Sequence, residues 1–370
     1  MSDPRFPSDA RGSRRWRIVL PLVLVVALAA GWSGFWYYAA SRAQTELAAW
    51  EAREASRGRI VTCAAQDFSG FPFRFELACA DPAVSDRSGL LSFRAKQLHA
   101  ALQIYQPNLA IAEVAGPLAM TRHGQPAGTL DWTLAQASVH GLSAPPQRIS
   151  FVVDRPAARL PDGTPLADAA HGELHLRPAA HAPQDPPAFD LALNLAQAHV
   201  SGIARLRDLP IDADITATLR GLSDFSPRPW RQVLRDLQAA NGRLELHAAR
   251  IREGDILAAG QGTLTLTPRG MLDGEIDLTV AGIEQLMTTL GLDEAVGRAS
   301  QKALDRLAPG LNLNSLLGPR GNAAIAAAGA AMLGKPAQLE GRQAVTLPLR
   351  LSDGTVFLGP LKVGEMAPLF

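Results

Sequence analysis

The chain has 370 residues, and its 36 basic and 35 acidic side chains leave a formal net charge of +1. A chain this balanced has no overall field that would favour nucleic acid or a strongly acidic partner. Charged residues make up only 19% of the sequence, which argues against extensive disorder, and its 27 prolines argue against a helical bundle. We therefore expect a folded, turn-rich protein with one large domain or two ordinary ones and no nucleic-acid partner.

An uncharged apolar stretch, Ile18–Ala40, dominates the N-terminus. It is long enough to cross a bilayer core of roughly 30 Å as one helix. Arginines precede it and aromatic residues crowd its far end: Arg11, Arg14, Arg15 and Arg17, then Trp32, Phe35, Trp36, Tyr37 and Tyr38. Because basic residues stay on the cytoplasmic side and aromatic rings favour the interface, we predict a single-pass anchor in the bacterial inner membrane. The N-terminus would then be cytoplasmic and the bulk of the chain periplasmic.

A cleaved signal peptide is the alternative interpretation, because Ala27-Leu28-Ala29 offers small residues at a cleavage position. Apolar and aromatic residues continue well past Ala30, which favours the uncleaved anchor, and both interpretations export the rest of the chain. The predicted segments are a tail (1–17), an anchor (18–40), a helix beside the membrane (41–57) and a β-rich domain (58–370). The segment 41–57 either continues the anchor helix or forms a short helix on the following sheet.

The only two cysteines, Cys63 and Cys79, stand early in the exported part. In an oxidising compartment two cysteines most simply form a disulfide, which would close a short loop and contribute about 3 kcal/mol in the chain-entropy model. Two buried thiols are the alternative.

From Arg59 onward the hydrophobic pattern has a period of two, which is typical of strands with one apolar and one solvated face. The runs are Phe73–Cys79, Leu98–Ile104, Leu130–Leu134, Ile149–Val153, Leu174–Leu176, Leu191–Leu195, Ile211–Leu219, Leu244–Ala248, Ile276–Val280, Val345–Leu351 and Thr355–Leu358. Helical spacing is confined to Ser226–Asn241, Gly282–Leu307 and the Ala-rich Asn322–Leu333. The predicted fold is mainly β (α+β): a long, curved antiparallel sheet with a few helices, preceded by one transmembrane helix.

His171, Glu173 and His175 would share one face of a strand and form a candidate metal cluster. Leu174 and Leu176 alternate with them, so the three polar residues are typical of the solvated face of a half-buried strand. A structural zinc site needs four ligands, and no fourth stands nearby. The sequence also lacks His-Glu-x-x-His, Gly-x-Ser-x-Gly, Walker and dinucleotide motifs. We expect no metal, no cofactor and no catalytic residue, and so no enzyme.

Two local stretches carry a resemblance to a known family. The first is Gly70-Phe71-Pro72-Phe73-Arg74, ahead of Cys79, and the second is Leu-Pro-Leu-Arg-Leu-x-Asp-Gly-x-Val-x-Leu-Gly-Pro, with Asp353, Gly354, Gly359 and Pro360. With the N-terminal anchor, they make the chain similar to the DUF2125 family of uncharacterised proteobacterial proteins. The resemblance implies membrane association and carries over no catalytic residue. A fainter similarity, through Gly262–Leu266 and Gly274–Val280, is to AsmA-type envelope proteins.

The predicted strands outnumber the helices that could cover them. Either the sheet folds over on itself, or part of its apolar face stays open as a trough, and a large open apolar face usually marks a binding site. The first hypothesis is a protein that binds or shelters membrane lipid, or another apolar ligand, along such a trough. The alternative is a structural or assembly partner of an envelope protein, with a closed β-sandwich core.

Overall fold

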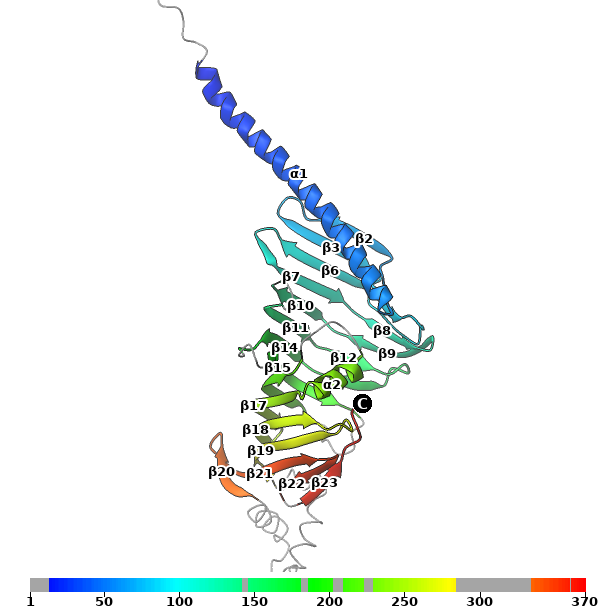
Figure 1. Cartoon of the computed structure of the whole chain (residues 1–370), viewed down its shortest axis with the longest axis vertical. Coiled ribbons are helices and arrows are strands. Elements are labelled where there is room, and N and C mark those ends of the chain that lie inside the picture. Colours follow the sequence, from blue (N-terminus) through cyan, green and yellow to red (C-terminus); the bar gives the residue numbers. More distant parts are fainter. Residues whose placement is uncertain are drawn as a thin grey trace, which may run out of the picture.

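The computed structural model describes residues 13–141, 146–180, 186–201, 209–222, 229–283, 334–359 and 361–370. Within these ranges it contains two helices and one continuous sheet of 23 strands, and every strand pair is antiparallel. The predicted fold class is therefore confirmed (Figure 1). The helices expected over Gly282–Leu307 and Asn322–Leu333 lie, from position 284 onward, outside the described residues.

Helix α1 (Ser13–Ser56) is one uninterrupted helix. By length and composition its span Val19–Ser56 is apolar enough to cross a membrane. The upper part of α1 stands clear of the sheet, whereas Trp36, Ala40 and Glu54 are buried against it (Figure 1). Gly58, with a positive φ of 86°, ends the helix, and its N–H donates to the carbonyl of Ala55. The segment after the apolar stretch thus continues the same helix.

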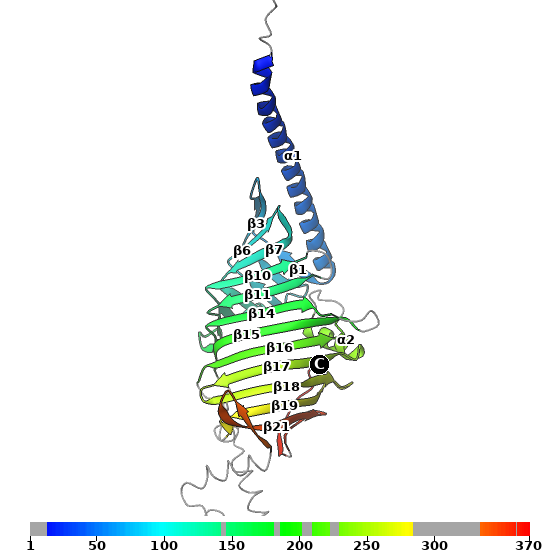
Figure 2. The same ribbon diagram turned by 90° about the vertical axis from the view of Figure 1, so that its left-hand side faces the viewer.

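The first layer of the sheet contains the long strands that are stacked in Figure 2. In spatial order they are β2 (Ala65–Ser69), β3 (Arg74–Ala80), β6 (Gln97–Gln103), β7 (Gln106–Ala115), β10 (Leu134–His140), β11 (Arg148–Asp154), β14 (His171–Pro178), β15 (Ala188–Val200), β16 (Ile211–Arg220), β17 (Arg243–Glu253), β18 (Ile256–Leu266), β19 (Leu272–Ala281), β21 (Arg342–Ser352), β22 (Thr355–Leu358) and β23 (Leu361–Glu365). β20 (Lys335–Leu339) pairs with the first half of β21.

The second layer is shorter and contains β1 (Arg59–Thr62), β4 (Ala83–Asp86), β5 (Leu91–Arg94), β8 (Leu118–Arg122), β9 (Gln125–Asp131), β12 (Ala157–Arg159) and β13 (Pro165–Asp168). They pair in that order, and β13 then pairs with the end of β15. Backbone bonds continue the ladder between the layers, for example from Asp81 N–H to the Lys96 carbonyl (3.1 Å) and from Arg155 N–H to the Ala170 carbonyl (2.9 Å). Asp81, Arg155 and Gln197 bend the chain there with positive φ values. The two layers are therefore one sheet folded along a crease.

One of the strand predictions is wrong at the crease. Leu130–Leu134 is not a single strand, because β9 ends at Asp131 and β10 begins at Leu134. Trp132 lies between them, and its indole Nε1–H donates to the Val114 carbonyl at 2.7 Å. The bend also shifts the alternation by one residue: Leu134 pairs with Asp154, and Ala135 pairs with Val153 on the apolar face. A periodicity of two cannot show this shift, since the apolar spacing continues through the bend.

The far end of the sheet holds a packed core. Its buried residues are Ile256, Val280, Ile283, Leu347 and Leu358. Helix α2 (Trp230–Ala239) contacts β18 and buries Leu237, which lies within the predicted helix Ser226–Asn241. The C-terminal residues lie beside α2 (Figures 1 and 2), where the Arg235 guanidinium sits 5.8 Å from the centre of the Phe370 ring.

Candidate functional site: an apolar trough

One row of apolar residues runs across the first layer, with each residue directly opposite the next on the neighbouring strand. It contains Phe75, Leu102, Ala110, Val139, Ile149, Leu176, Leu191, Ala217, Leu246, Gly262, Ile276, Leu349 and Leu358. Adjacent strands lie about 4.8 Å apart, so the row extends for about 58 Å along the sheet. Its unbroken register makes one face of the layer apolar from end to end.

A second apolar row runs beside the first. It contains Leu77, Ala100, Ala112, Ala137, Phe151, Leu174, Leu193, Ile215, Ala249, Gly260, Leu278 and Leu347. A β-bulge around His247 in β17 keeps both rows on one face, because without an extra residue every later side chain of that strand would turn over. This apolar face is the inside of the fold, since its residues become buried at the crease, where Cys79 is fully enclosed.

The inside of the fold is open in its middle part. Phe151 remains 46% exposed and Leu193 37% exposed, whereas Leu347, on the same row as both, is only 1% exposed. Between β7 and β15 the apolar face lines a cavity of about 440 Å³, within the range of ligand pockets. Its lining is almost wholly aliphatic and aromatic, with Ala112, Val114, Ala137, Phe151, Leu174 and Leu195 among its residues. We call this open apolar channel the trough.

Small residues give the trough its width. Ala112 and Ala137 face each other on the adjacent strands β7 and β10, and Gly172 lies on β14, beyond β11; larger residues at these positions would fill the space. A Cβ on Gly172 would approach a methyl group of Val153 to 3.2 Å. The trough can therefore hold an apolar ligand by exclusion of water, and it presents few groups that could orient a polar substrate.

The first apolar row begins at α1. Phe75, the first residue of the first row, stacks on Trp36 with ring centroids 5.6 Å apart. Trp36 also meets Phe71 edge-on at 5.5 Å, and its indole N–H donates to the Arg74 carbonyl at 3.1 Å. The apolar part of α1 and the start of the first apolar row thus share one aromatic cluster.

Two further links hold the α1 end of the molecule together. Cys63 and Cys79 form a disulfide with a Cα–Cα distance of 5.5 Å, which is the pairing that the sequence indicates. The buried Glu54 carboxylate, near the end of α1, forms ion pairs with Arg57 (3.2 Å) and Arg59. The second partner belongs to β1, so this pair fastens the helix to the shorter layer.

The residues of the two family motifs shape the two ends of the sheet. Gly70 has a φ of 103°, and a Cβ there would lie 2.6 Å from the Arg74 carbonyl oxygen, so the loop before β3 requires glycine. Asp353 and Gly354 form the turn between β21 and β22, where Arg269 pairs with Asp353. Gly359 N–H donates to the Pro348 carbonyl at 2.8 Å, and Pro360 lies outside the described residues.

His171, Glu173 and His175 lie on the outer face, opposite the trough. Glu173 accepts a bond from each histidine, at 2.8 Å from His171 Nε2 and 3.0 Å from His175 Nε2. Asp154 and Ser150 contact the other two ring nitrogens. The bonds to Glu173 and Asp154 raise the pKa of His171, and the two histidines lower the pKa of Glu173. All four ring nitrogens are thus engaged, and no group of three or more metal-ligating side chains is found among the described residues.

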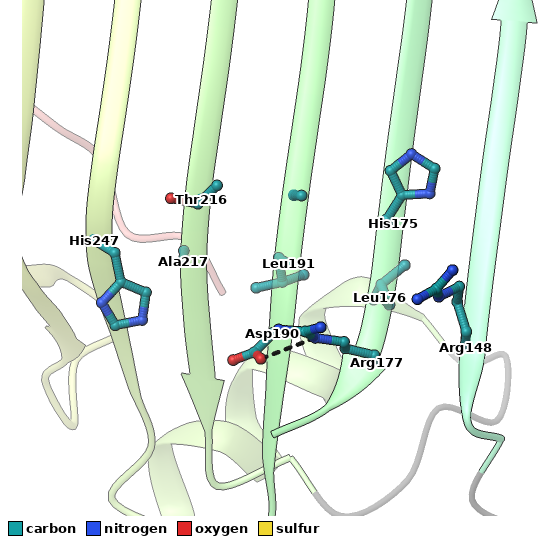
Figure 3. A pocket seen from close by; sticks show the side chains of 10 residues that line it. Arg148, His175, Leu176, Arg177, Asp190, Leu191, Thr216, Ala217 and His247 are labelled. Carbon is teal, nitrogen blue, oxygen red and sulfur yellow. Dashed lines mark hydrogen bonds and ion pairs between the residues drawn. The ribbon is translucent and has the colours of Figure 1, made fainter. Parts of the chain in front are cut away.

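A second hollow, of about 540 Å³, lies on the outer face (Figure 3). Arg177 pairs with Asp190 at 3.2 Å, and the buried Thr218 hydroxyl lies 2.9 Å from Asp190 and 2.7 Å from His247 Nε2. In a hydrolase triad the histidine stands between the acid and the nucleophile. Here the hydroxyl stands between the acid and the histidine, so the arrangement ties three strands together and does not activate a nucleophile.

The fold and the trough define a class: a β-sheet protein with an N-terminal apolar helix and an open apolar channel on the inside of its sheet. Residues 36–367 match the family model described as "Uncharacterized protein conserved in bacteria (DUF2125)". Because the match covers most of the chain, the protein belongs to the DUF2125 family, which confirms the resemblance. The matched region begins at Trp36, the first buried residue of α1. Comparison with curated proteins and with solved structures finds no match.

Proposed function

We propose that this protein is anchored by α1 in the bacterial inner membrane and shelters the acyl chains of membrane lipid in its trough. The observation that carries the proposal is the apolar face of the first layer: its first row starts at Phe75, beside the membrane helix, and its second row lines the open cavity. An exposed apolar channel of this length costs free energy in water unless something apolar covers it. A lipid that leaves the bilayer beside α1 would meet this channel first.

The proposed topology has the N-terminus in the cytoplasm and the trough in the periplasm. Arg14, Arg15 and Arg17 precede the apolar stretch, and basic residues flank such a stretch on the cytoplasmic side. The disulfide supports the same orientation, because disulfides persist in oxidising compartments such as the periplasm.

Two matched variants test the proposed ligand. Ala137→Trp places a large ring in the trough, whereas Ser138→Trp places the same ring at the next position of β10, on the outer face. Full-length protein would be purified in mild detergent, its folding checked by circular dichroism, and its bound lipid measured by native mass spectrometry. We expect lipid to co-purify with the parent chain and with Ser138→Trp, and to be lost from Ala137→Trp.

Protein without bound lipid in all three samples would refute the proposal. Equal lipid in the two tryptophan variants would place the lipid elsewhere, for example around α1. A discrete protein crosslinked through the outer face in intact cells, with an empty trough, would favour the assembly role instead.

A further inference from the structure

The end of the sheet nearest the exposed part of α1 carries three exposed aromatic side chains. Phe71 and Phe73, in the loop between β2 and β3, are 49% and 62% exposed, and Tyr105, in the turn between β6 and β7, is 71% exposed. The loop and the turn are joined, because Ile104 N–H donates to the Phe73 carbonyl at 3.0 Å. We call Phe71, Phe73 and Tyr105 the aromatic tip. Figure 2 shows β3, β6 and β7 at the upper end of the sheet, beside α1.

The aromatic tip is fixed to a particular level of α1. The Trp32 indole N–H donates to the Pro72 carbonyl at 2.9 Å, and Tyr37 stacks on Phe71 with ring centroids 6.1 Å apart. A helix rises 1.5 Å per residue, so a hydrocarbon core of roughly 30 Å that starts at Val19 ends about 20 residues later, near Tyr38. Trp32 and Tyr37 therefore belong to the last two turns of the span, and the loop bonded to them lies at the same depth.

From this geometry we infer that the aromatic tip inserts into the periplasmic surface of the bilayer. The inference rests on the membrane span proposed above and does not require that the trough hold lipid. Large aromatic side chains are favoured at the headgroup level, where their rings meet the acyl boundary. Trp32, Phe35, Tyr37 and Tyr38 of α1 are exposed as well, so helix and tip together present one aromatic surface. The inserted tip places the α1 end of the apolar face at the lipid leaflet.

Site-specific photocrosslinking tests the insertion. p-Benzoylphenylalanine would replace Phe73 or Tyr105 in the full-length chain, reconstituted in vesicles of equal parts phosphatidylethanolamine and phosphatidylglycerol. Val26, in the exposed part of α1, reports on the membrane span, and Trp230, an exposed aromatic residue on α2, serves as the matched control away from the membrane. We expect lipid adducts at Phe73 and Tyr105 in a yield equal to that at Val26, and none at Trp230. The melting temperature of each variant would show that it folds.

Three outcomes would separate the proposals. Adducts at Val26 but not at Phe73 or Tyr105 would refute insertion of the tip and leave the membrane span intact. The absence of adducts at Val26 would refute the span and the insertion together. The double variant Phe73→Ser with Tyr105→Ser gives a second measurement: if the tip is inserted, this loop should become accessible to added protease in the vesicles. An unchanged cleavage rate would overturn the inference, because the parent loop would then already lie in water.

Discussion

The two ends of the sheet use the same apolar row in opposite ways. Leu193, in the trough, and Leu347, near the C-terminus, stand on one row that runs from strand to strand, yet the first is 37% exposed and the second is enclosed. At the C-terminal end Ile256, Val280 and Leu358 pack into a cluster with Leu347. No described residue packs over Leu193 in that way. Identical strand patterns thus become either a core or an open apolar surface, depending on what lies opposite.

The open end is held together by other means. Its buried residues are few and mostly small, and its layers are joined by the backbone ladder across the crease. The disulfide and the Glu54 ion pairs lie at this end, next to α1. Covalent and ionic links here take the place of a buried core, so the apolar face can stay open. The following predictions test this contrast.

The largest effect is expected from truncation of the enclosed leucine. Leu347→Ala should lower the free energy of unfolding by about 2–5 kcal/mol, because it leaves a cavity in a packed cluster. Leu193→Ala, the same change on the same row, should cost less than about 1 kcal/mol, because that side chain is already partly solvated. Denaturant unfolding in detergent micelles, followed by circular dichroism, measures both. Equal losses would mean that the trough is packed in solution.

Loss of the disulfide should have the next largest effect, confined to the open end. Cys63 and Cys79 are separated by 16 positions, and closing a loop of that length contributes about 3 kcal/mol in the chain-entropy model. Hydrogen exchange on reduced protein should accelerate in β2, β3 and β6 and stay unchanged in β18–β21. The Cys63→Ala and Cys79→Ala double variant should behave like reduced protein, and uniform acceleration over the whole sheet would contradict local stabilisation.

Glu54→Gln should loosen the end of α1. We expect a loss of roughly 2 kcal/mol, below the 3–5 kcal/mol typical of fully buried pairs, because Arg59 keeps part of its hydration. Trypsin cleavage after Arg57 should accelerate accordingly. Glu46→Gln is the matched control: its partner Arg42 is 3.5 Å away on the exposed helix surface, where an ion pair contributes little. Similar cleavage rates in the Glu54 and Glu46 variants would show that the Glu54 ion pairs do not hold the end of α1 in place.

The smallest effect is expected on the outer face, as a pH dependence. His171 has a raised pKa, so its contribution to stability is complete below the ordinary histidine pKa, about 6.5, and is lost as pH rises through the raised value. Glu173 has a lowered pKa, so its contribution is complete above the ordinary glutamate pKa and is lost as pH falls through the lowered value. At a pH above the ordinary glutamate pKa and below the ordinary histidine pKa, both contributions to stability are complete.

His171→Gln should therefore remove the part of the stability loss that occurs as pH rises above about 6.5. Melting temperatures across this range measure the difference between variant and parent. His123→Gln, a change in the turn between β8 and β9, is the control and should leave the parent profile unaltered. A parent-like profile for His171→Gln would show that the outer-face cluster does not contribute.

Local patterns were enough to predict much of this protein. The apolar stretch predicted α1, and the period of two predicted strands such as β21 and β22. The presence of two cysteines, Cys63 and Cys79, in the exported part suggested their bridge, and the motif around Gly70 indicated the family. Each of these features depends on residues that are neighbours in the chain or on a simple composition rule.

The crease, the trough and the aromatic tip could not be predicted in this way. Trp132 stands at a bend that the alternation of Leu130 and Leu134 conceals. Phe73 and Tyr105 are far apart in the sequence, and only strand pairing brings them together beside Trp32. The alternation along a strand such as β15 or β21 already indicates its apolar face, and it fails only across the bend at Trp132. Whether that face meets side chains, as at Leu347, or stays open, as at Leu193, follows from the folded arrangement, because burial depends on contacts between distant strands.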